Sequence, residues 1–127
     1  MTVLNASDPE QRVALVSAVA PGDAWLVACL CAAWCKTCDE YRDTFDALAA
    51  LHPTWAFAWI DIEDEAELVG DHDVEDFPTL LVQHGDDVLF IGALTPQKGV
   101  AQRLLESLAE GPAAAVDSTL NLRARLL

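Results

Sequence analysis

Apolar residues fall at two different spacings along the chain, and the change of spacing predicts a strand, a helix and a second strand. Residues 25–32 form an uninterrupted apolar run, which is typical of a central strand covered on both faces. Between residues 34 and 51 the apolar positions follow the helical period, and Pro53 then breaks the helix. The run at 55–62 predicts the second strand. Elements in this order make a parallel, right-handed unit.

Further elements are expected on both sides of this unit. The segment Ser7-Asp8-Pro9-Glu10 is typical of a helix start with Ser7 as the N-cap, and Pro21-Gly22 closes that helix. Beyond the unit, a four-residue turn separates two strand-like runs, which indicates an antiparallel hairpin. We expect a short helix at 65–70, hairpin strands at 79–83 and 88–91, and a last helix that opens at Pro96 and ends at Gly111.

The length of the chain predicts that all these elements belong to one domain. At 127 residues, 53% of them hydrophobic, a domain buries roughly two thirds of its unfolded surface and needs neither disulfides nor a structural metal. We predict a domain over residues 1–110 and a C-terminal tail over 111–127. The tail is either loose or holds one short helix capped by Ser118, and its leucines favour packing on this domain or on a second copy.

The charge balance narrows the range of partners. The chain carries 7 Lys plus Arg and 21 Asp plus Glu, so its formal net charge is −14. This charge repels phosphate backbones and anionic membrane surfaces, and we therefore expect neither nucleic acid nor a membrane as a partner. The most apolar run, 25–34, has about half of the ~20 residues that a membrane-spanning helix needs. Residues 13–20 resemble a signal-peptide core but follow acidic residues, so we expect a cytoplasmic protein.

All four cysteines lie within residues 29–38, and two of them form a C-x-x-C motif. At the mouth of a strand-to-helix turn, this spacing places Cys35 and Cys38 within disulfide reach. Unpaired backbone N–H groups and the helix dipole favour the thiolate of Cys35, and Lys36 adds a neighbouring positive charge. Cys38, one turn deeper, is expected to stay protonated and to resolve the intermediate. We expect no cofactor beyond a redox-active Cys35–Cys38 disulfide.

Two further segments accompany this motif. Residues 33–38, Ala-Trp-Cys-Lys-Thr-Cys, look like the redox motif of the thioredoxin family; Phe77-Pro78-Thr79 is similar to its cis-proline loop, and Ile91-Gly92-Ala93-Leu94 matches the loop beside its active site. Over about residues 8–109 the chain therefore resembles that family. The resemblance implies an α/β fold, a thioredoxin-like three-layer α/β/α sandwich in which helices flank a central mixed β-sheet, with a cis peptide bond before Pro78.

The resemblance also implies an activity and its site. The implied activity is that of a thiol-disulfide oxidoreductase in cell redox homeostasis. In this activity Cys35 attacks a protein disulfide and Cys38 displaces the reduced product. A flavin-dependent reductase is the expected electron donor. An extended substrate peptide is expected in a groove lined by Trp34, Phe77, Pro78, Thr79, Gly92 and Ala93.

The departures from the family concern the residues around the thiols. Lys36-Thr37 stands where the family usually has Gly-Pro, its buried acid falls on Cys29, and that acid's lysine partner falls on Trp59. We expect Lys36 and Cys29 to adjust thiol acidity or relay a proton. Because a buried neutral thiol accepts protons poorly, resolution by Cys38 is expected to be slow and to rise with pH. The alternatives are that Cys29 exchanges disulfides with Cys38, or that Cys29 and Cys31 are only small buried hydrophobes.

A metal site is the main alternative for the four thiols. On spacing alone, Cys29, Cys31, Cys35 and Cys38 offer four ligands to zinc or an iron–sulfur cluster. A strand holds the first two in line, however, whereas structural zinc sites usually pair two C-x-x-C turns from separate loops. We therefore expect no metal.

Two other features leave alternatives open. His52, His72 and His84 share no metal-ligand spacing and are interpreted as solvated surface. The run 61–76 holds nine acids and no base, but it lacks the regular spacing of a calcium loop; we interpret it as a solvated face that steers basic partners toward Pro78. An interaction module of the same fold, in which turnover is incidental, is the alternative function.

Overall fold

The computed structural model describes residues 3–70, 74, 76–93, 97–111, 115–116 and 120–127. Predictions that concern His72, Leu94, Pro96, Ser118 and part of the acidic run fall outside these residues. In chain order the elements are β1 (Leu4–Asn5), α1 (Pro9–Val19), β2 (Trp25–Cys31), α2 (Lys36–Leu51), β3 (Ala56–Asp61), α3 (Ala66–Val69), β4 (Thr79–His84), β5 (Asp87–Ala93), α4 (Lys98–Glu110) and α5 (Leu122–Leu126).

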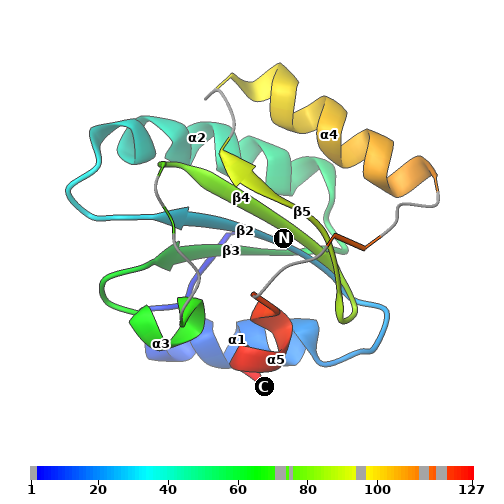
Figure 1. The fold of residues 1–127 in the computed structure, drawn as a ribbon, viewed down its shortest axis with the longest axis horizontal. Coiled ribbons are helices and arrows are strands. Elements are labelled where there is room, and N and C mark those ends of the chain that lie inside the picture. The colour runs from blue at the N-terminus through cyan, green and yellow to red at the C-terminus, as the bar shows by residue number, and fades with distance from the viewer. Residues whose placement is uncertain (1–2, 71–73, 75, 94–96, 112–114, 117–119) are drawn as a thin grey trace.

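The five strands form one mixed sheet in the order β1-β3-β2-β4-β5 (Figure 1). β2 runs parallel to β3 and antiparallel to β4, and β5 continues the sheet antiparallel to β4. The predicted strand–helix–strand unit and hairpin are therefore confirmed. The sequence analysis missed β1, whose two residues pair parallel to β3 and are too few to display a strand period.

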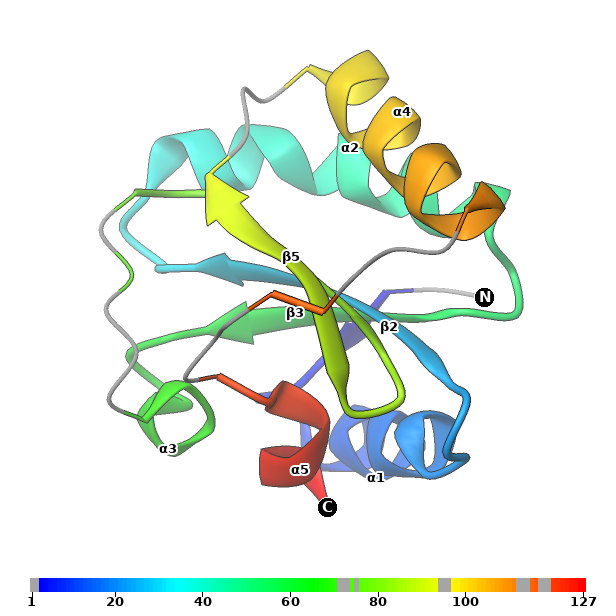
Figure 2. The ribbon, with the colours of Figure 1, turned by 45° about the vertical axis from the view of Figure 1, so that its right-hand side comes forward.

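Helices cover both faces of this sheet: α2 and α4 lie on one face, and α1, α3 and α5 lie on the other (Figure 2). Alternate residues of β2 point to opposite faces. Cys29 and Cys31 belong to the core beneath α2, whereas Ala28 and Leu30 belong to the core on the other face. The three-layer sandwich is confirmed, and two buried thiols face the helix that carries Cys38. No helix within the described ranges has both the length and the apolar character to cross a membrane.

The start of α1 differs in one detail from the prediction. Asp8, not Ser7, is the N-cap, and its carboxylate accepts hydrogen bonds from two backbone N–H groups of the first turn, at 3.0 and 3.3 Å. The backbone N–H of Ser7 instead donates to the side chain of Asn5 over 2.9 Å. The predicted Ser7 cap is wrong because the turn that follows β1 engages this residue, while Pro9 occupies the first turn as expected.

The C-terminal segment packs on this domain, which is one of the two expected outcomes. Leu120, Leu122 and Leu126 are 0, 0 and 6% exposed and belong to the core formed with α1. The guanidinium of Arg123 donates to the last carbonyl groups of α1 and forms an ion pair with Asp86 at 2.8 Å. A cation at the C-terminal end of a helix satisfies free carbonyls and opposes the helix dipole.

A buried glutamine joins this segment to the hairpin. Gln83 in β4 is fully buried and donates to the side chain of Asn121 and to the carbonyl of Gly85, while its own oxygen accepts from the backbone of Arg123 at 3.3 Å. A buried amide needs such partners, because leaving it unpaired costs about 1–3 kcal/mol. The short helix α5 is therefore anchored by polar as well as apolar contacts. Its N-cap is Asn121, whose side chain accepts from the backbone N–H of Ala124 at 3.1 Å, and not the predicted Ser118.

We expect the hairpin turn to require glycine at position 85. Gly85 has a φ of +58°, and a Cβ there would overlap the carbonyl oxygen of Gly22. Gly85→Ala should lower the free energy of unfolding by about 1–3 kcal/mol, measured by urea denaturation. The matched control is Gly111→Ala, where a Cβ has no neighbour within 4 Å, and its effect should stay within about 0.5 kcal/mol. Equal effects of the two substitutions would contradict this account.

Candidate active site

The C-x-x-C motif lies where β2 passes into α2. Because β2 ends at Cys31 and α2 begins at Lys36, Cys35 is the N-cap residue of a helix of 16 residues. The backbone N–H of Cys35 donates to the carbonyl of Ala32 at 3.0 Å and so holds the turn closed. Cys35 is partly exposed, whereas Cys38, one turn further along, is only 1% exposed. The accessible and the buried thiol are therefore placed as expected.

Three of the four thiols, those of Cys29, Cys31 and Cys38, belong to one buried core. Cys35, which is partly buried, packs against this core. Cys31 lies 3.4 Å from Cys29, sulfur to sulfur, and both are buried. Sequence reasoning gave Cys29 the place beneath the resolving thiol and missed the contact between Cys29 and Cys31. The i, i+2 spacing on a strand was the available signal, because it puts both thiols on one face.

The surroundings of Cys31 and Cys38 favour neutral thiols. Burial, followed by the hydrogen bond to Cys31, raises the pKa of Cys38 well above its ordinary value, and a hydrogen bond from the backbone of Ala32 opposes this rise. The hydrogen bond to Cys29, followed by burial, raises the pKa of Cys31 even more strongly. Neither inner thiol therefore ionises readily near neutrality.

Tyr41 belongs to the same core as the buried thiols, and sequence reasoning treated it only as part of the apolar face of α2. The residue is 2% exposed, and its hydroxyl has no hydrogen-bond partner among the described residues. Burial, followed by the charges of Cys29 and Cys31, raises the pKa of Tyr41 to about 12. The phenol therefore stays protonated near neutrality and can donate a hydrogen bond.

The expected groove residues come from three segments. The Phe77–Pro78 peptide bond is cis, as the resemblance implied. Trp34 is 69% exposed and packs against Phe77 edge to face, with 5.4 Å between ring centroids. Pro78 and Thr79 are buried, and Thr79 pairs across the hairpin with Ala93.

Gly92 and Lys36 are the other two predicted site residues. Gly92 is half-buried and follows the same hairpin, pairing with Leu80. Lys36 is exposed on the first turn of α2, directly beside Cys35 in sequence. A charge in that position is screened by solvent, so its effect on the thiol is modest.

An aromatic cluster occupies the place where the family's lysine partner was expected. Trp59 lies opposite Cys29 in the β2–β3 pairing and packs against Phe45, with 5.9 Å between ring centroids. The guanidinium of Arg42 lies 4.9 Å above the Trp59 ring. A cation over an aromatic face is a favourable contact worth about 0.5–1 kcal/mol at exposed sites. Side chains packed around Trp59 therefore cover part of the sheet face that carries the thiols.

Two of the histidines are not the solvated side chains that the sequence suggested. His52 stacks on Trp55 with 4.0 Å between ring centroids, and His84 stacks on Trp25 at 4.3 Å. Both histidines are half-buried, and burial lowers the pKa of His52, against the opposing charge of Glu106. The prediction was wrong for two reasons: the turn after α2 places His52 on Trp55, and the pairing of β2 with β4 places His84 beside Trp25.

Metal-ligating side chains do not converge in the part of the chain that the structure describes. Within those residues, no group of three or more His, Cys, Asp or Glu side chains is arranged to hold a metal ion. Of the acidic residues, Glu65 forms an ion pair with Arg12 at 3.0 Å, so it is not simply solvated.

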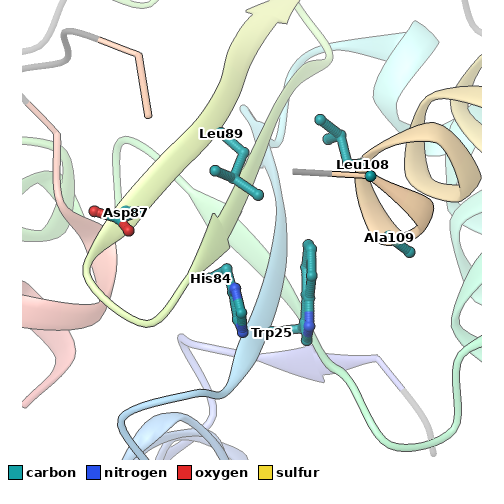
Figure 3. Close-up of a pocket in the computed structure, with 7 residues that line it drawn as sticks. Trp25, His84, Asp87, Leu89, Leu108 and Ala109 are labelled. Atoms are coloured by element: carbon teal, nitrogen blue, oxygen red, sulfur yellow. The ribbon is translucent and has the colours of Figure 1, made fainter. Parts of the chain in front are cut away.

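A separate cavity of about 300 Å³ lies at the other end of β2 (Figure 3). Trp25 and His84 line it from the sheet, and Leu108 and Ala109 line it from α4. β2 begins at Trp25 and ends at Cys31, so the length of this strand separates the cavity from the thiols. The cavity therefore contributes nothing to the thiol site.

A family model for thioredoxin matches residues 10–106, which is more than half of the chain. The chain belongs to the thioredoxin family. No curated protein sequence matches it. Membership of the thioredoxin family supports an activity of the oxidoreductase kind, and the half-exposed and buried pair of thiols lies within the matched residues.

Solved thioredoxins have the same fold as this thioredoxin-family chain. A poplar thioredoxin h matches with a TM-score of 0.73 at 14% identity, covering 88% of this chain and 100% of that one. A thioredoxin from Trypanosoma brucei brucei matches with a TM-score of 0.68 at 23% identity, covering 87% and 93%. A thioredoxin from Nicotiana alata matches with 0.68 at 16% identity, covering 84% and 91%. Identities this low show the fold alone, so the details of the chemistry have to be argued from the residues of this chain.

Proposed function

We propose that this protein is a disulfide reductase that acts on protein disulfides, with Cys35 as the nucleophile and Cys38 as the resolving thiol. The observation that carries the proposal is the placement of Cys35, partly exposed at the N-cap of α2, one helical turn before a Cys38 that is 1% exposed. Only the outer thiol can meet a bulky substrate. Free N–H groups at the start of the helix favour the negative charge that the attacking sulfur carries.

The proposed reaction transfers two electrons to the substrate in two exchanges. The thiolate of Cys35 attacks one sulfur of the substrate disulfide, which forms a mixed disulfide and releases the first substrate thiolate. Cys38 then loses its proton and attacks the sulfur of Cys35, which releases the second substrate thiolate. The substrate thiolates take up protons, and the protein is left with a Cys35–Cys38 disulfide.

The substrate and the reductant are further parts of the proposal. Exposed Trp34 and its contact Phe77 support a groove for an extended peptide beside Pro78. A flavin-dependent reductase that returns two electrons to the Cys35–Cys38 disulfide completes the cycle. The proposed role of this cycle is redox homeostasis in the cytoplasm. The net charge of −14 favours basic substrates.

Catalytic reduction of a model protein disulfide, with dithiothreitol in excess, tests this function. The wild type should accelerate reduction well above the rate with dithiothreitol alone, and Cys35→Ser should fall to that background rate. Lys36→Ala is the matched control, because Lys36 is the exposed neighbour of Cys35 and should retain most of the turnover. A wild type without turnover would favour an interaction module of the same fold and would contradict the proposal.

The second exchange is expected to become faster as the pH rises. Since burial and the bond to Cys31 raise the pKa of Cys38, its thiolate fraction is small near pH 7 and grows about tenfold per pH unit until the pKa is passed. Resolution can be followed by loading Cys35 with a chromogenic thiol as a mixed disulfide and recording its release between pH 6 and 9. Cys38→Ser loaded in the same way should release none. A flat pH profile in the wild type would contradict the argument.

A further inference from the structure

We propose that the cavity at the start of β2 is a second binding site, which takes a small aromatic amine. Such a ligand has a flat apolar body and one positively charged nitrogen. The cavity has a volume of about 300 Å³, which lies at the lower end of the range for small-molecule sites. At roughly 30 Å³ for a water-sized group, it has room for about ten non-hydrogen atoms. One aromatic ring with a short aminoalkyl chain is a ligand of this size.

The walls of the cavity are mainly apolar and come from three elements. Leu89 and His84 line it from the β4–β5 hairpin (Figure 3). Leu108 and Ala109 line it from the end of α4, and Trp25 lines it from the start of β2. An apolar ligand that enters is removed from water, which favours binding, and an aromatic ring gains a further contact with the indole. The walls therefore favour a flat apolar body.

Ring stacking fixes the position of the Trp25 wall. The ring of Trp25 lies parallel to that of His84 at 4.3 Å and to that of Trp55 at 4.6 Å, centroid to centroid. His52 stacks on Trp55 in the same way, so four rings form one continuous stack. Trp25 and His84 are also partners in the β2–β4 pairing. Because these side chains are already ordered, little conformational entropy is lost when a ligand binds against them.

The charge at the cavity favours a cation. Asp87 lines the cavity and is exposed, so its carboxylate stands at the rim. Within the described residues this carboxylate forms no ion pair. None of the lining residues that the structure describes is a lysine or an arginine, and the chain carries a net charge of −14. An ammonium group beside Asp87 therefore gains a partner, whereas an anionic ligand is repelled.

The cavity lies far from the thiols and from the proposed peptide groove. β2 has seven residues, from Trp25 at the cavity to Cys31 before the C-x-x-C turn. A rise of about 3.3 Å per residue gives this strand a length of roughly 20 Å. A ligand in the cavity therefore leaves Trp34 and Cys35 accessible. The inference goes beyond the reductase function and does not depend on it.

Titration of the full chain with phenethylamine, followed by isothermal calorimetry, tests the inference. Phenethyl alcohol and phenylacetate are matched ligands, with the same ring and a neutral or a negative group. The amine should bind saturably and about tenfold more tightly than the alcohol, because a carboxylate bonds more strongly to a charged donor. Phenylacetate should bind more weakly than either. Equal affinities for the three, or no saturable binding of the amine at millimolar concentrations, would overturn the inference.

Two substitutions locate the bound amine. Asp87→Asn should weaken the binding of the amine about tenfold, whereas Asp43→Asn removes the same charge from an exposed position of α2 and should have no effect. Ala109→Leu extends a side chain from the lining of the cavity and should abolish binding. Its matched control is Ser107→Leu, at an exposed position of α4 outside the lining. Since all four positions are exposed, the fold should tolerate these changes. An unchanged affinity in Asp87→Asn or in Ala109→Leu would overturn the inference.

A further variant separates the cavity from the groove. Trp34 is 69% exposed and offers an alternative aromatic surface to the amine. Trp34→Ala should bind phenethylamine as tightly as the wild type does. Loss of binding in this variant would place the amine in the groove and would contradict the assignment to the cavity. The turnover assay decides the reductase function separately, because none of these titrations requires turnover.

Discussion

Replacing Cys38 with serine is expected to trap the protein on its substrates as mixed disulfides and, where no other thiol is present, to stop the reaction after the first exchange. The nucleophile Cys35 remains partly exposed at the start of α2, so the first exchange still proceeds. The second exchange lacks its thiol, because serine is not a nucleophile toward a disulfide under these conditions. Incubation of Cys38→Ser with a protein disulfide, followed by non-reducing electrophoresis, should show a covalent adduct that dithiothreitol removes.

The two cysteines should behave oppositely in this experiment. Cys35→Ser should form no adduct, because its remaining thiols are almost completely buried. Alkylation of the reduced wild type at neutral pH should accordingly label Cys35 first. Adducts of Cys35→Ser, or earlier labelling of Cys38, would reverse the assigned roles.

Deletion of residues 120–127 is expected to cost the domain most of its stability. Three leucines of this segment are 6% exposed or less, and burying each contributes about 1.5–3 kcal/mol, so their loss removes roughly 5–9 kcal/mol. A whole domain of this size is stable by only about 5–15 kcal/mol. The deletion also leaves Gln83 buried without its partner Asn121. Urea denaturation should show a transition at a much lower midpoint or none at all.

Single substitutions within the segment keep this prediction measurable if the deleted chain does not fold. Leu122→Ala should lower the free energy of unfolding by about 2–5 kcal/mol, because Leu122 is fully buried in the core with α1. Leu127→Ala is the matched control, since Leu127 is 59% exposed, and its effect should stay within about 0.5 kcal/mol. A deletion that leaves the midpoint unchanged would make the segment a mere linker.

Local patterns were sufficient to predict the framework of this fold. The apolar run of β2, the helical period of α2 and the turn between β4 and β5 are each properties of neighbouring residues, and they were found at nearly the expected positions. The outermost features were not predicted. β1 is only two residues long, and the N-cap of α1 moved from Ser7 to Asp8 because the adjoining turn engages Ser7.

The C-x-x-C pair and its place at a strand-to-helix turn could be predicted from the residue pattern alone, and the family resemblance added the cis bond before Pro78. These features depend on residues that are adjacent in the chain. The packing of the layers was needed to show that His84 stacks on Trp25, that Trp34 meets Phe77, and that the last residues close the core beside α1. The physical reason is that periodicity states which face of an element a side chain occupies, whereas the side chain that it meets is set by how the layers pack.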